Sequence, residues 1–122
     1  MGLLSFLKRI FKGDGKLYPE SLTQVGFDSE RIWVKHPDQD EESILWEELI
    51  GVAIRTTDEG PYNPDVFWIL GTKEKTLIYP GGATGESEMI ERLQKLPNFD
   101  NEAVISAMGS AFNNTFICWE NK

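Results

Sequence analysis

The chain has little of what most catalytic and metal sites require. It contains one cysteine, Cys118, and one histidine, His36. A single cysteine excludes a disulfide within the chain, and one cysteine with one histidine leaves most zinc sites and nucleophile–base pairs short of residues. Cys118 lies in the alternating apolar run TFICWE, which is typical of a buried thiol, and His36 lies beside Pro37 in a predicted turn. We therefore expect a non-enzymatic protein with no metal and no cofactor. The lack of disulfides fits a reducing compartment, so we expect a cytoplasmic location.

Long apolar runs are also missing. The longest strong run covers residues 66–70, which is far below the roughly 18 residues of a membrane span. The length of 122 residues lies in the range of roughly 100–200 residues that is usual for one domain. We divide the chain into an N-terminal amphipathic helix, residues 1–15, and a single domain, residues 16–122.

Positive charge is scarce and unevenly spread. The chain has 12 basic and 20 acidic residues, a net charge of −8. Residues 1–12 carry three basic side chains and no acid, which leaves −11 on the other 110 residues. A body this acidic repels nucleic-acid phosphates and attracts a basic protein partner. A homodimer is a further alternative. The plainer interpretation of the acidic excess is that it keeps a small protein soluble.

The first fifteen residues predict a short helix that ends at Gly13 and Gly15. Leu3, Leu7 and Ile10 fall on one face, with the basic side chains mostly opposite. Such a helix can contact an anionic membrane, or it can pack on its own domain or on a second copy. We expect packing on protein, because so short a helix with one basic cluster makes a marginal membrane anchor.

From about residue 22 the hydrophobic period becomes that of strands. Six short strands are predicted in series, over 23–27, 31–36, 42–46, 50–57, 65–71 and 75–80. The turns between them are too short for crossover helices, so neighbouring strands should be antiparallel. A helix follows over 86–96, with one apolar stripe formed by Met89, Ile90, Leu93 and Leu96. A second helix over 101–112 is capped by Asp100 and turns Val104, Met108, Ala111 and Phe112 inward, and a strand covers 115–120. The predicted fold class is α+β: a curved antiparallel meander sheet of about six strands, closed by two C-terminal helices and a last strand.

Two groups of residues are candidates for a binding site. Trp33 and Trp46 lie on strands joined by the loop PDQDEE, and outward-facing indoles there would form an aromatic patch. The loop DEGPYNP and its end supply Asp58, Glu59, Tyr62 and Asp65. Asp58 and Asp65 also carry the competing interpretation, a small hydrolase that uses loop carboxylates. Core packing of the tryptophans and solvated carboxylates in turns are the plainer alternatives.

The stretch SILWEELIGVAIRTTDEGPYNPDVFWIL, followed by LIYP and LQKLPNFDNEAVISAM, resembles a group of small uncharacterised bacterial proteins. The strand–WxEL–strand corner is similar to bacterial pleckstrin-homology-like domains. The resemblance covers about residues 22–119 and implies a sheet-plus-helix domain without a known catalytic residue. The last strand, TFICWE, departs from the pleckstrin-homology plan, which ends in a helix.

Small acidic proteins of this kind also resemble immunity proteins encoded beside bacterial toxins, a resemblance of size and charge that implies a basic toxin as partner. We therefore expect a protein-binding domain with a basic protein partner, and an immunity-like role toward a basic toxin is its specific version. A small hydrolase, and a membrane-proximal adaptor that acts through the N-terminal helix, are the alternatives.

Overall fold

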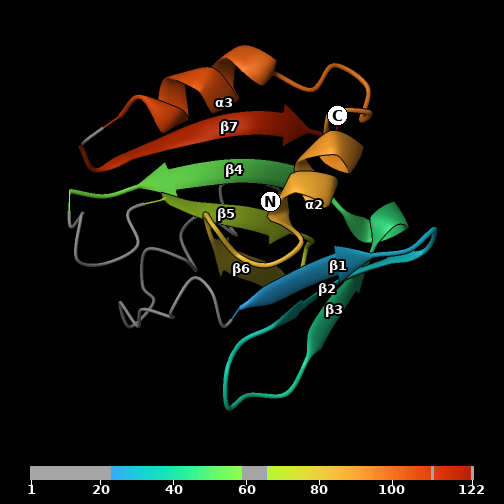
Figure 1. The fold of residues 1–122 in the computed structure, drawn as a ribbon. Coiled ribbons are helices and arrows are strands. Elements are labelled where there is room, and N and C mark those ends of the chain that lie inside the picture. The colour runs from blue at the N-terminus through green and yellow to red at the C-terminus, as the bar shows by residue number, and fades with distance from the viewer. Residues whose placement is uncertain (1–22, 59–65, 111, 122) are drawn as a thin grey trace.

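Two antiparallel sheets form the frame of the domain in the computed structural model, which describes residues 23–58, 66–110 and 112–121 (Figure 1). The three-stranded sheet has the order β1-β2-β3. Its strands are β1 (Gln24–Phe27), β2 (Arg31–Lys35) and β3 (Glu42–Leu45). The four-stranded sheet has the order β6-β5-β4-β7. Its strands are β4 (Gly51–Thr56), β5 (Val66–Gly71), β6 (Thr76–Pro80) and β7 (Asn114–Glu120). With the helices α2 (Glu86–Leu93) and α3 (Asn101–Met108), this confirms the α+β fold class.

The prediction of one curved six-stranded sheet is wrong, because the chain changes sheets between β3 and β4. A 3-10 turn, Trp46–Glu48, follows β3, and Leu49, which is buried, donates its N–H to Trp46 O. Strand β4 then pairs with β5 on one edge and with β7 on the other. No edge of β4 is left for β3, so the meander splits into two sheets.

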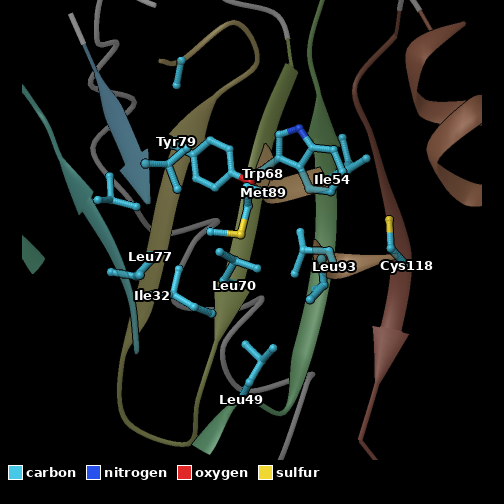
Figure 2. Packing of buried hydrophobic residues seen from close by; sticks show 14 of the residues in the cluster. Ile32, Leu49, Ile54, Trp68, Leu70, Leu77, Tyr79, Met89, Leu93 and Cys118 are labelled. Carbon is cyan, nitrogen blue, oxygen red and sulfur yellow. The ribbon is translucent and has the colours of Figure 1, made fainter. Parts of the chain in front are cut away.

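The core lies on one side of the four-stranded sheet. Alternate residues of β4, β5 and β6 supply Ile54, Trp68, Leu70, Leu77 and Tyr79, which pack with Met89 and Leu93 of α2 (Figure 2). The rings of Trp68 and Tyr79 stack with centroids 6.3 Å apart. The helix predicted over 86–96 is present but ends at Leu93. Its predicted apolar stripe faces the core: Met89 and Leu93 have no exposed surface, and Ile90 is partly buried.

The second helix is shorter than predicted and turns a different face inward. Asp100 caps α3 as expected, because its carboxylate accepts the N–H of Ala103 at 3.1 Å. The helix ends at Met108, since Thr56 holds the following loop by donating its hydroxyl to Phe112 O at 2.7 Å. The buried residue of α3 is Ala107, whereas Met108 and Phe112, expected inside, are exposed. Val104 is partly buried against the core, and Ala111 lies outside the described residues.

The predicted N-terminal helix, residues 1–15, also lies outside the described part of the chain. Within the described residues, neither helix is long and apolar enough to cross a membrane.

Candidate functional site

The structure separates the residues that the sequence groups into candidate sites. Trp33 lies on the face of the three-stranded sheet that points away from the core, whereas its buried neighbours Ile32 and Val34 point to the core. Trp46 packs against the core side instead, so the two indoles do not form one patch. Asp58 is exposed two residues beyond β4. Three further candidates lie outside the described residues: Glu59, Tyr62 and Asp65.

Trp33 covers a glycine on the neighbouring strand. Gly26 is its cross-strand partner, and a Cβ at Gly26 would lie 2.5 Å from Trp33 Nε1. The indole therefore lies against the backbone of β1, which is a known way of covering a glycine in a sheet. Arg31 and Lys35 lie two residues to either side of Trp33 on β2, so they share its face of the three-stranded sheet. The surface around Trp33 thus carries positive charge although the whole chain is acidic.

Trp46 holds the corner between the two sheets. Its indole N–H donates to Asp28 O at 2.8 Å. Its ring meets Phe27 edge-on with centroids 6.1 Å apart, and the Arg92 guanidinium lies 4.0 Å from the ring centroid. The N–H and one face of the ring are used within the chain, so Trp46 serves the fold rather than a free aromatic surface.

Exposed carboxylates surround this corner. They belong to Asp28, Glu30, Glu47 and Glu48. The pKa of Asp28 is lowered because its carboxylate accepts the backbone N–H groups of Arg31 and Glu30. This end of the three-stranded sheet can attract a basic partner, although the side chains of Arg31 and Arg92 offset part of the charge.

Large exposed apolar side chains gather at the end of α3. Ile105 is 71% exposed, Met108 50% and Phe112 73%; we call these three residues the α3 ridge. With roughly 200 Å² for each residue, they expose on the order of 400 Å², a size that is often functional on a monomer. The sequence pattern does not predict the ridge, because it indicates that Met108 and Phe112 face inward. Its signal in the sequence is the pair Ala103 and Ala107, which offers a second inward face on the same helix.

The only histidine and the only cysteine are far apart. His36 contacts the backbone of Ile78 on β6, whereas Cys118 lies on β7. Strands β6 and β7 are the two outer strands of a four-stranded sheet, about 14 Å apart at roughly 4.8 Å per strand. Burial and the charge of Asp100 raise the pKa of Cys118 to about 12. The two residues therefore do not form a nucleophile–base pair.

Glu86 binds two donors at the start of α2. Its carboxylate accepts the indole N–H of Trp68 at 2.9 Å and the N–H of Gly82 at 2.8 Å. Burial, together with the charge of Glu86, raises the pKa of Tyr79 well above its ordinary value. At neutral pH the Tyr79 phenol is therefore protonated and packed in the core, and Glu86 supports the strand-to-helix turn.

In the described part of the chain, no three His, Cys, Asp or Glu side chains gather as a metal site. Among the described residues, the α3 ridge holds three of the four large apolar side chains that are exposed. No family model, curated protein or solved structure matches the chain.

Proposed function

We propose that this protein is a non-enzymatic binding domain whose ligand is another protein, and that the α3 ridge is the contact surface. The observation that carries the proposal is the exposure of Ile105, Met108 and Phe112, each at least half in water. Apolar patches of this size on a monomer are often functional, and protein–protein contact is one of the functions they serve. Phe112 is the most exposed of the three, which suits an aromatic anchor that enters a pocket on the partner.

The size of the ridge permits a specific complex. Burying on the order of 400 Å² at about 25 cal/mol/Å² contributes roughly 10 kcal/mol before the cost of association. Association and ordering cost about 4–15 kcal/mol, so the ridge needs support from a surrounding polar contact.

Charge supplies a preference among partners. The chain carries −8, and exposed carboxylates stand around Trp46 as well as at Glu102, three residues before Ile105. A basic partner is steered to such a surface faster than a neutral one. An immunity-like role toward a basic toxin is the specific version of this proposal, and it rests on size and charge.

The test is a binding assay with a purified partner. Proteins captured on the immobilised chain, and the product of any neighbouring toxin gene, are purified and titrated against wild type, Phe112→Ser and Phe112→Leu. We expect Phe112→Ser to weaken binding at least about tenfold, and Phe112→Leu, which keeps an apolar side chain, to stay within about threefold of wild type. Binding should weaken with added salt if the partner is basic.

Two results would overturn the proposal. Equal affinities for all three chains would show that the ridge is not the contact surface. Substrate turnover that is lost in Asp65→Asn would show that the chain is a hydrolase, the competing interpretation of its loop carboxylates.

A further inference from the structure

A second apolar surface lies on the four-stranded sheet, on the face that points away from the core. Ile78, Ile69, Ala53 and Ile117 are direct cross-strand partners on β6, β5, β4 and β7. Direct partners point to the same face of an antiparallel sheet. These four residues therefore form one apolar row across the whole sheet, and none of them belongs to the core cluster. We call this surface the outer face.

The described elements pack on the opposite side of the sheet. Met89 and Leu93 bring α2 to the core side, and the three-stranded sheet contributes Ile32 to the same cluster. The end of α3 is held there as well, because Thr56, two residues from Ile54 on β4, donates to Phe112 O. Yet Ala53 and Ile69 on the outer face have no exposed surface. An isoleucine in the middle of a bare sheet face would be solvent-exposed, so the middle of this face is covered, whereas Ile117 on the outermost strand β7 is 36% exposed.

We propose that the chain's own residues 1–12 dock on the outer face. The segment places Leu3, Leu7 and Ile10 along one helical face, which supplies an apolar stripe for the row of isoleucines. On the predicted helix the three basic side chains fall mostly on the opposite side, where docking would leave them in water. The proposal is independent of the α3 ridge, which lies on the core side of the sheet.

The tether favours the chain's own segment over a second copy. Eleven residues separate Lys12 from β1 at Gln24, and they reach up to about 36 Å at roughly 3.3 Å per residue. The four-stranded sheet is only about 14 Å wide between its outer strands. The segment can therefore reach any point of the outer face, at an effective concentration in the millimolar range.

Disulfide trapping in the full chain tests the proposal. Leu7→Cys is combined with Ile78→Cys in one variant and with Ile117→Cys in another, and a control variant combines it with Ser87→Cys on α2. Each is treated with oxidised glutathione. The native Cys118 is 1% exposed and its pKa is about 12, so it leaves the engineered pair to react. Two positions on either side of Ile69 keep the test valid if one variant fails to fold.

We expect an intramolecular disulfide in at least one of the two outer-face variants, formed at least about tenfold faster than in the control. A disulfide-linked dimer at these positions would assign the face to the segment of a second copy and overturn the proposal. Equal rates in all three variants would also overturn it. A third outcome would overturn it too: slow disulfide formation in both outer-face variants, together with flotation of the full chain with anionic vesicles at low salt. The segment would then be a membrane anchor.

Discussion

Gly85 is the residue at which a single methyl group should damage the fold most. It precedes α2 with φ at +94°, a left-handed conformation that side chains other than glycine rarely adopt. A Cβ at this position would lie 2.1 Å from the backbone oxygen of Val25 on β1. The neighbouring Thr84 holds the same strand, since its oxygen accepts the N–H of Val25 and its N–H donates to Thr23 O, both at 2.9 Å. Gly85→Ala therefore strains the turn and pushes β1 away from it.

The cost has two parts. The left-handed conformation costs about 1–2 kcal/mol for a residue with a Cβ. Relief of the clash moves β1 and weakens its two hydrogen bonds to Thr84, each worth about 0.5–1.5 kcal/mol. We expect Gly85→Ala to lower the free energy of unfolding by roughly 2–5 kcal/mol, a fall in Tm of about 10 °C or more for a domain of this size.

Gly109→Ala is the matched control. Gly109 ends α3 with φ at −94°, and a Cβ there would lie 3.8 Å from its nearest neighbours, the backbone oxygens of Ile105 and Ser106. This substitution should be neutral or should stabilise by up to about 1 kcal/mol, through the lower entropy of the unfolded chain. Urea unfolding followed by circular dichroism measures both variants. A loss below about 1 kcal/mol in Gly85→Ala, or an equal loss in Gly109→Ala, would refute the reasoning.

Three further predictions concern single side chains. Gly26→Ala should cost about 1–2 kcal/mol of stability by displacing the Trp33 indole, and this cost should vanish in a Trp33→Ser background; a cost that persists there would contradict the packing of the indole on Gly26. Cys118, with its pKa at about 12, should react with iodoacetamide at about pH 8 roughly a thousandfold more slowly than a free thiol until urea unfolds the chain; rapid labelling of the native protein would contradict its burial. His36 should titrate below 6.5 in the single histidine NMR signal, because burial lowers its pKa. Since the folded pKa is the lower one, stability should fall as the pH drops below 6.5, and His36→Gln should remove that loss; an NMR midpoint at or above 6.5 would contradict it.

The local elements of the fold could be predicted from the sequence because their signals are local. The alternation in β2 predicts that Ile32 and Val34 share one face and that Trp33 lies on the other, and the burial of the two aliphatic side chains confirms this; which face turns to the core did not follow from the pattern. The stripe of Met89 and Leu93 and the strand boundaries, within two residues, followed from period alone. The split into two sheets did not, because the strand that takes the second edge of β4 lies about sixty residues further on, at β7.

The candidate site was predictable only in part, for two physical reasons. Trp46 comes one residue after β3 ends, in a 3-10 turn, so the alternation of a strand does not give the direction of its side chain. On α3, Val104 and Met108 form as regular a helical face as Ala103 and Ala107 do. The packing of α3 on β7 and β4 buries Ala107, leaves Ala103 and Val104 partly buried and leaves Met108 exposed, and this contact is not visible in the pattern of the helix.

This packing bears on the contact surface proposed at the α3 ridge. A helix normally gains about 1.5–3 kcal/mol for each large apolar side chain that it buries, and α3 forgoes this gain at Ile105 and Met108 while burying Ala107. Folding therefore gives no reason for large apolar groups at these positions, and polar replacements there should change the free energy of unfolding by less than about 0.5 kcal/mol. Exposed apolar side chains that the fold does not need are what the proposed contact surface requires. Phe112→Ser separates the two roles, because it should leave the urea midpoint unchanged while it weakens partner binding.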